Sequence, residues 1–212
     1  MQRPPELRPM TPTASDSVLA LLLGLIILPE LTLQLAGPLG LPDLRQAAYR
    51  LAGFHSGAGD ILFPVQRAAR YLTYMLVHTG PLHLIVNVIA LIWLWQLVGT
   101  QRTAPGALIL CLICGIGAAL IFAVIGPAQG VMVGASGALF GLLGVYIVDC
   151  CRAGPLQQTL YLTGAAVALS LIDLACRNIF GSDTAWQAHA GGFGVGAFAA
   201  LALDRFSCLK VG

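Results

Sequence analysis

The sequence predicts an all-α polytopic membrane protein, a six-transmembrane-helix bundle with a partly membrane-embedded first loop. Of its 212 residues, 58% are apolar and only 9% are charged. A soluble domain carries about 25% charged residues, so nine acidic and eleven basic residues are too few to cover a water-facing surface of this size. The mean hydropathy of +0.84 points the same way. Six membrane helices use about 120 residues, which leaves little chain for a second domain.

The chain divides into a short polar N-terminal tail at residues 1–16, a single membrane domain at 17–204 and a short C-terminal tail at 205–212. The first predicted span covers residues 17–36 and is interrupted by Pro29 and Glu30. Residues 17–28 also have the length of the apolar part of a signal peptide. Renewed apolar sequence after Glu30, without a clean cleavage site of small residues, favours an uncleaved span.

A long first loop of mixed polarity follows, from residue 37 to 75, and it holds four of the eleven basic residues. The remaining predicted spans are residues 82–98, 106–125, 136–149, 159–175 and 188–203. The span that starts at Ser136 is only about 14 residues long. Because a bilayer core needs about 20 helical residues, one end of this span should lie below the membrane surface.

The basic residues suggest an orientation for these spans. With the N-terminus inside, the inner segments hold Arg3, Arg8, Arg102, Arg152, Arg205 and Lys210. The outer segments hold Arg177 and the four arginines of the first loop. The inner charges lie on shorter segments and are therefore denser, which favours both termini in the cytoplasm.

Charge and cysteine content exclude other classes of function. A net charge of +2 gives no argument for a nucleic-acid partner. Cys111 and Cys114 have C-x-x-C spacing, but they lie inside an apolar run without a histidine or a second cysteine pair beside them. We therefore interpret them as buried membrane cysteines, with no disulfide framework. No metal and no organic cofactor is implied.

Polar residues inside the predicted spans are the candidates for function, because burying them in lipid is costly. His78 and His83 lie at the start of the second span, and His189 lies at the start of the sixth. The second, fourth and sixth spans run in the same direction, so their N-terminal ends share one face of the membrane. Ser136, at the start of the fourth span, lies on that face as well.

These residue types suit nucleophilic catalysis. A serine is a poor nucleophile without an adjacent base, and His189 is the obvious base for Ser136. His83 and Asn87 are four residues apart and share a helix face, so they can supply two donors to an oxyanion site. The Ser136 N–H, at a helix start, has no intrahelical acceptor and gains from the helix dipole.

Small residues support the contact between the fourth and sixth spans. Stripes of this kind permit close helix approach in lipid, and they comprise Gly137, Gly141, Gly144, Ala188, Gly192 and Gly196. No carboxylate is well placed as a third catalytic member, since Asp149 lies at the far end of its span. The sequence therefore predicts a Ser–His dyad, and Phe140, one turn after Ser136, can hold the imidazole by packing.

Each feature has a plainer interpretation when it stands alone. A serine between small residues is common at helix contacts, a membrane histidine often serves as a structural group or proton relay, and an intramembrane asparagine often joins helices. Glycine stripes alone usually indicate packing. The combination of all of them at one end of three parallel spans favours chemistry.

Together these motifs resemble the rhomboid family of intramembrane serine proteases. The matching elements are H-x4-H-x3-N at His78, His83 and Asn87, G-A-S-G at residues 134–137, A-H-x-x-G-x-x-x-G at residues 188–196, and Arg70, which is similar to the arginine of the family's W-R pattern. The resemblance covers residues 70–196. Ala69 replaces the aromatic residue that often precedes the arginine, and Phe140 stands where some relatives have tyrosine.

The resemblance implies a role for each position. Ser136 would be the nucleophile and His189 the general base and acid. The Ser136 N–H, His83 and Asn87 would form the oxyanion hole. Structural support of the site is implied for His78, Gly134, Gly137, Phe140, Gly192, Gly196 and Arg70. The fifth span and the loop before His189 would form a side gate for a substrate helix.

The sequence thus predicts an intramembrane serine endopeptidase that cleaves transmembrane or juxtamembrane segments of membrane-protein substrates. Its partners would be the lipid bilayer and substrates with a transmembrane helix, and its location the bacterial plasma (inner) membrane with both termini cytoplasmic. A first alternative is a polytopic transporter or proton-conducting channel that uses the membrane histidines. A second is a non-cleaving rhomboid-like protein that binds helices.

Overall fold

The computed structural model describes residues 13–41, 43–56, 64–153, 160, 163–164 and 185–208. Five long helices correspond to predicted spans: α1 (Ala14–Ala36), α4 (Pro81–Gly99), α5 (Ala104–Ile125), α6 (Ser136–Ala153) and α8 (Trp186–Cys208). The predicted span at 159–175 and the loop after it lie almost entirely outside the described residues. By length and composition, α1, α4 and α5 can each cross a membrane. The chain is therefore an integral membrane protein with several membrane-spanning helices.

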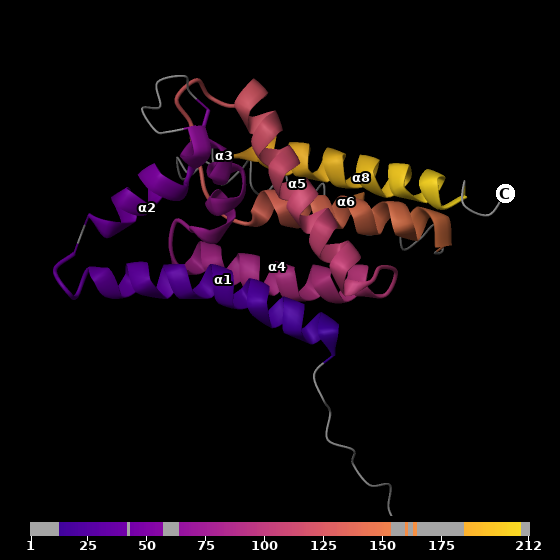
Figure 1. Ribbon diagram of the computed structural model, residues 1–212, viewed down its shortest axis with the longest axis horizontal. Coiled ribbons are helices and arrows are strands. Elements are labelled where there is room, and N and C mark those ends of the chain that lie inside the picture. The colour runs from indigo at the N-terminus through magenta and orange to yellow at the C-terminus, as the bar shows by residue number, and fades with distance from the viewer. Residues whose placement is uncertain are drawn as a thin grey trace, which may run out of the picture.

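The helices α4, α6 and α8 run in the same direction, and their first residues lie at the same end of the molecule (Figure 1). The sequence predicted this parity for the ends that carry His83, Ser136 and His189. Helix α6 packs along α8, α5 crosses both, and α1 lies beside α4. Three first turns that come from distant parts of the sequence therefore meet at one end of the bundle.

Close contact between α6 and α8 depends on the predicted small residues. A Cβ atom added at Gly192 would overlap the carbonyl oxygen of Gly137, and one added at Gly196 would overlap that of Gly141. The two backbones therefore touch without intervening side chains, as small-residue stripes permit in lipid. This contact fixes the position of the α8 first turn relative to that of α6.

Helix α1 begins earlier than the sequence predicted because Thr13 and Asp16 form a capping box. The Asp16 N–H donates to Thr13 Oγ1 at 3.2 Å, and the Thr13 N–H donates to Asp16 Oδ2 at 2.9 Å. These two bonds satisfy N–H groups that a helix start leaves without partners. The helix then continues through Pro29 to Ala36.

The first loop is largely ordered. It contains α2 (Leu44–Ala52), β1 (Phe54–His55), α3 (Pro64–Thr73) and a 3-10 turn, η1 (Tyr74–Leu76). Arg70 is 3% exposed and donates from Nε to the Leu51 carbonyl at 3.3 Å and from a terminal nitrogen to the Arg50 carbonyl. Thr73 Oγ1 donates to the Ala52 carbonyl at 3.0 Å. Side chains of α3 and the turn after it thus satisfy the carbonyl groups at the end of α2.

A short antiparallel sheet corrects the all-α expectation. The strand β1 pairs with β2 (Val131–Met132), with Phe54 opposite Met132 and His55 opposite Val131. Strands of two residues are too short to show alternation in a sequence. The pairing joins the first loop to the segment that leads into α6, whose first residue is Ser136.

Helix α6 also extends beyond its predicted end at Asp149, to Ala153. Asp149 is 6% exposed and receives hydrogen bonds from Arg102 Nε at 3.1 Å and from a terminal guanidinium nitrogen at 2.5 Å. This two-pronged pair neutralises the carboxylate inside the helix. A charged residue therefore does not end the helix here, because its partner comes from the turn between α4 and α5.

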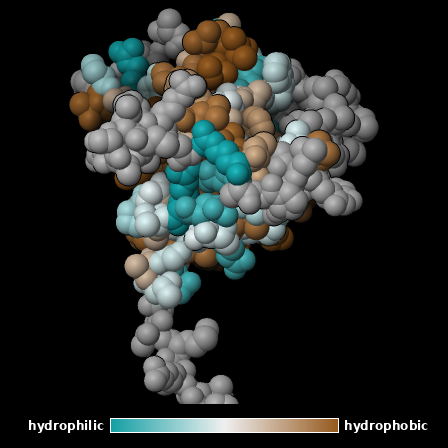
Figure 2. All heavy atoms as spheres, turned by 90° about the vertical axis from the view of Figure 1, so that its right-hand side faces the viewer, coloured by the Kyte–Doolittle hydropathy of each residue, from teal (hydrophilic) through white to brown (hydrophobic). Residues whose placement is uncertain are grey.

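The outer surface of the bundle is apolar along its helices. Leu28 on α1 is 64% exposed, Ile89 on α4 62% and Val124 on α5 80%. In water such residues would form large exposed apolar patches, whereas in a membrane they would contact the lipid acyl chains. Figure 2 looks onto the end at which α4 turns into α5, and hydrophilic side chains gather in the middle of that face. This end of the bundle thus carries a polar patch, while the sides of α1, α4 and α5 expose apolar residues.

Candidate active site

Ser136 and His189 lie within hydrogen-bonding distance. Ser136 is the first residue of α6, and His189 lies in the first turn of α8. The distance from Ser136 Oγ to His189 Nε2 is 2.8 Å. Because the backbones of α6 and α8 touch at their glycines, the first turns of the two helices lie directly against each other. The pair has the geometry that a nucleophile and its base require.

Phe140 packs flat against the His189 ring. The ring centroids are 4.5 Å apart, and the ring planes differ by 15°. Phe140 lies one turn after Ser136 on α6, so the helix that carries the serine also positions the imidazole of the neighbouring helix. Packing of this kind restricts the orientation of the ring while its Nε2 faces Ser136.

A glycine turn precedes Ser136. Gly134 has φ of +109°, a conformation that only glycine adopts easily. Its N–H donates to the Tyr74 carbonyl at 2.9 Å, and the Tyr74 hydroxyl donates to the Gly115 carbonyl on α5 at 2.8 Å. Tyr74 is fully buried. Sequence reasoning missed this residue, because a lone tyrosine at the end of a loop carries no periodic or motif signal.

The His83 ring lies against this glycine turn. A Cβ atom added at Gly134 would stand 2.6 Å from His83 Cε1 and 3.0 Å from Nε2. The other ring nitrogen, Nδ1, lies 3.4 Å from the Thr79 backbone nitrogen and 3.1 Å from Thr79 Oγ1. The edge of His83 that includes Nε2 therefore faces the loop two residues before Ser136.

Asn87 lies one turn further along α4 and is 2% exposed. Its Nδ2 donates to the His83 carbonyl at 2.8 Å. An amide nitrogen carries two hydrogens, so this bond uses one and leaves the other for a second acceptor. The arrangement brings Ser136, His189 and His83 to one end of the bundle, with Asn87 deeper in α4.

Comparison with known proteins agrees with this arrangement. Residues 65–206 match the Rhomboid domain, which is more than half of the chain. The chain belongs to the rhomboid family. It is also 30% identical over 125 residues to RHOMBOID-like protein 1 of Arabidopsis thaliana, a match that covers 58% of this chain. The chain spans about a third of the length of that relative, since the match covers 31% of it.

The rhomboid motif residues outside the Ser–His pair have structural contacts. His78 is fully buried, and its ring meets that of His83 edge-on, with centroids 5.2 Å apart. Burial, together with the nearby His83, lowers the pKa of His78 to about 4, against the opposing influence of Glu30. His78 is therefore neutral at pH 7. Arg70 lies apart from the Ser–His pair and holds the end of α2, as described above.

The rhomboid domain match begins within α3 and so leaves out α1 and α2. Cys111 and Cys114, inside the match, are buried free thiols on α5, as predicted. The predicted side gate, formed by the fifth span and the loop before His189, lies almost entirely outside the described residues.

Proposed function

We propose that this chain is an intramembrane serine endopeptidase that cleaves transmembrane or juxtamembrane segments of other membrane proteins. The hydrogen bond between Ser136 Oγ and His189 Nε2, 2.8 Å long, carries the proposal. It joins the two residue types that form a catalytic dyad, inside a rhomboid domain. The flat packing of Phe140 on the imidazole adds support, because it restricts the orientation of the base.

The reaction follows from these groups. Ser136 Oγ attacks the carbonyl carbon of the peptide bond while His189 Nε2 takes the hydroxyl proton. The tetrahedral intermediate collapses when His189 gives this proton to the leaving amine, and the N-terminal product remains as an ester on Ser136. Water then attacks the ester with His189 again as base. The carboxylic acid product leaves, and the serine regains its proton.

The negative charge on the carbonyl oxygen needs donors in the intermediate. The Ser136 N–H is available in the first turn of α6. His83 Nε2, beside Gly134, and the second hydrogen on Asn87 Nδ2 are the side-chain donors in our proposal. The Ser136 N–H and the Asn87 amide are neutral donors, which suits a site within a membrane, because a neutral donor is less costly to bury than an ion.

The same proposal includes an orientation with both termini in the cytoplasm. The Ser136 end of the bundle lies opposite the end that carries Arg102, at the turn between α4 and α5 (Figure 1). Because basic residues favour the cytoplasmic side, Arg102 supports an orientation in which the active site lies toward the outer face. Reporter fusions after residue 212 test this: a fluorescent protein should be active there, and a periplasmic phosphatase should not.

A covalent serine-hydrolase probe tests the function directly. A fluorophosphonate should label the purified wild-type protein in detergent, and it should not label Ser136→Ala or His189→Ala. The matched controls are Ser17→Ala in α1 and His55→Ala, whose ring contacts the Tyr49 carbonyl oxygen in the first loop. Both should be labelled like the wild type. A substrate with one transmembrane helix and small residues near a helix-destabilising segment should be cleaved by the same three labelled proteins.

The two alternatives give other results. A transporter or proton channel predicts flux in proteoliposomes that survives Ser136→Ala. A helix-binding protein without activity predicts substrate binding with no product in any variant. Absence of probe labelling in the folded wild-type protein, or equal labelling of Ser136→Ala, would overturn the protease proposal.

A further inference from the structure

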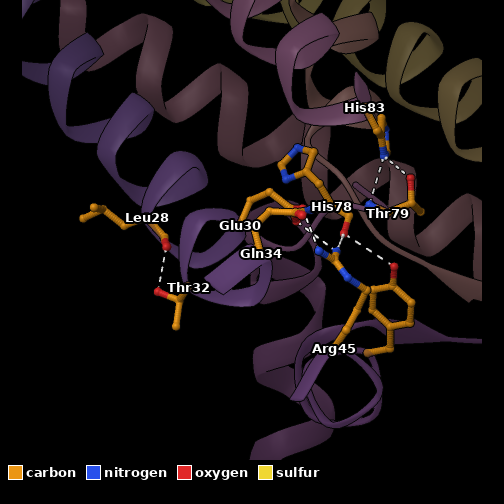
Figure 3. A network of polar contacts seen from close by, with 9 residues as sticks. Leu28, Glu30, Thr32, Gln34, Arg45, His78, Thr79 and His83 are labelled. Carbon is orange, nitrogen blue, oxygen red and sulfur yellow. Dashed lines mark hydrogen bonds and ion pairs between the residues drawn. The ribbon is translucent and has the colours of Figure 1, made fainter. Parts of the chain in front are cut away.

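A carboxylate is buried in α1, at the residue that interrupts the first apolar span, and it pairs with a partly exposed arginine of α2. Glu30 is 1% exposed, and Arg45 from α2 donates to both of its carboxylate oxygens, at 2.8 Å and 3.1 Å. Gln34, one turn later in α1, donates to Glu30 Oε1 at 2.7 Å (Figure 3). A buried carboxylate is costly, so this position calls for an explanation beyond helix packing.

The second contact of Arg45 reaches the backbone just before α4. The terminal nitrogen that binds Glu30 Oε2 also donates to the His78 carbonyl oxygen at 2.9 Å. The Tyr49 hydroxyl approaches the same oxygen at 3.5 Å. Glu30 therefore fixes the guanidinium, and the guanidinium holds one carbonyl group of the turn that leads into the helix of His83 and Asn87 (Figure 3).

This carbonyl and the Thr79 N–H belong to the same peptide group. A peptide unit is planar, and in its trans form the C=O and N–H point in opposite directions. No described residue has a cis peptide bond. When Arg45 holds the His78 oxygen on one side, the Thr79 hydrogen is therefore directed to the other side. It is directed at His83 Nδ1, from which the Thr79 nitrogen is 3.4 Å distant.

The direction of this hydrogen decides the tautomer of His83. A backbone N–H can only donate, so Nδ1 must accept, and a neutral imidazole then carries its proton on Nε2. The Nε2 edge is the one that lies against Gly134. The Thr79 hydroxyl, 3.1 Å from Nδ1, can act as donor or acceptor and does not by itself select a tautomer.

We propose that Glu30 and Arg45 are positioning residues for the oxyanion hole: through the His78–Thr79 peptide they keep the His83 proton on Nε2, toward the carbonyl oxygen of the substrate. The use of that proton rests on the proposed protease function. Glu30 and Arg45 both lie outside the Rhomboid domain match at residues 65–206. The contacts of Glu30 and Arg45 thus connect the part of the chain before the Rhomboid domain match to His83, a proposed oxyanion donor.

Two readouts test the proposal on the full-length protein in detergent micelles. The first is the ¹⁵N spectrum of histidine-labelled protein, in which His83, assigned by its loss in His83→Gln, should show a protonated Nε2 and an unprotonated Nδ1. The second is the split between kcat and KM on the model substrate. Glu30→Gln and Arg45→Ala should give a mixture of His83 tautomers and a kcat lower by about tenfold. This is less than the roughly 10²- to 10³-fold effect of losing a donor completely. KM should change little.

Matched variants separate positioning from loss of structure. Arg50→Ala removes another arginine from α2 and should keep the wild-type tautomer and kcat. Thr79→Val removes the hydroxyl but keeps the N–H, so its spectrum should also remain that of the wild type.

A cavity of about 400 Å³ borders Arg45, Gln34 and Thr79. Ethylguanidinium should therefore enter Arg45→Ala and restore both the single tautomer and part of kcat. Where Arg45→Ala folds poorly, Glu30→Gln gives the same comparison.

The proposal is overturned if folded Glu30→Gln and Arg45→Ala keep a single Nε2-protonated tautomer and wild-type kcat. It is also overturned if wild-type His83 carries its proton on Nδ1. These outcomes differ from failure of the protease function, which appears as absent fluorophosphonate labelling of the wild type. The tautomer spectrum can be measured in either case.

Discussion

The Phe140 ring lies flat on the His189 imidazole, 4.5 Å between centroids and 15° between planes. The same imidazole contacts Ser136 through Nε2. One helix thus supplies both the nucleophile and the surface against which the base rests. In our proposed mechanism, this surface has the orienting function that a carboxylate has in a three-residue triad.

Replacement of Phe140 by leucine should slow catalysis with little loss of stability. Leucine keeps apolar volume but loses the stack, and an aromatic pair is worth about 0.5–1.5 kcal/mol beyond its buried area. We expect kcat to fall about three- to tenfold, because the imidazole samples more orientations. Phe140→Tyr keeps the ring and should retain wild-type kcat. An equal kcat in Phe140→Leu and Phe140→Tyr would contradict an orienting role for the stack.

Gly134→Ala should inactivate the site even though Ser136 and His189 remain. The new Cβ would stand 2.6 Å from His83 Cε1, and alanine is strained at φ of +109°. His83 must move, and the loss of one oxyanion donor lowers kcat by about 10²- to 10³-fold. Steady-state cleavage of the model substrate measures this effect.

Gly99→Ala is the matched control for this substitution. Gly99 ends α4, and an added Cβ there meets nothing within 4 Å. Its kcat should equal that of the wild type. If Gly134→Ala instead retains wild-type kcat, His83 does not serve as a donor from the position in which it lies.

The Arg102–Asp149 pair should contribute to stability rather than to activity. It lies at the end of α6 opposite Ser136, about 20 Å along the helix for the 13 intervening steps. Removing one partner of a buried pair costs about 3–5 kcal/mol. Because Arg102 is 18% exposed, we expect the lower part of this range in Arg102→Met, seen as a reduced Tm in detergent.

The double variant Arg102→Met/Asp149→Leu separates the pair from its surroundings. It leaves no unpaired buried charge, so most of the lost stability should return. Cleavage rates per folded molecule, measured well below the Tm, should match the wild type in both variants. A double variant as unstable as Arg102→Met would show that other contacts of Arg102 dominate.

Much of the candidate site was predictable because membrane composition simplifies the sequence. Apolar runs locate the helices, and helix parity alone brings the first turns of α4, α6 and α8 to one end. The few polar residues in these turns then stand out, which is why His83, Ser136 and His189 could be selected together. The glycine spacing also predicted that α6 and α8 would touch.

The other features of the fold and the site depend on contacts between distant residues, which leave no pattern in the local sequence. Tyr74 supports the Gly134 turn through its backbone carbonyl, which any residue type could supply. Glu30 looked like an interruption of a span, because its partner Arg45 lies in a different element. The predicted end of α6 at Asp149 was wrong for the same reason. A sequence shows the cost of a buried charge but does not show which distant group offsets it.

The last prediction concerns pH and rests on His78. Burial, together with His83, lowers its pKa to about 4 from 6.5, and Glu30 and Arg45 are the charged groups that border the same network. Between these two pH values the unfolded chain binds a proton that the folded protein does not. The contribution of His78 to stability is therefore fully present above about pH 6.5 and falls as the pH decreases toward 4, by at most about 1.4 kcal/mol per pH unit.

Tm measured across this range should fall more steeply in the wild type than in His78→Gln. His55→Gln, which changes a half-buried histidine of the first loop, should keep the wild-type slope. Parallel curves for the wild type and His78→Gln would mean that folding does not hold His78 neutral.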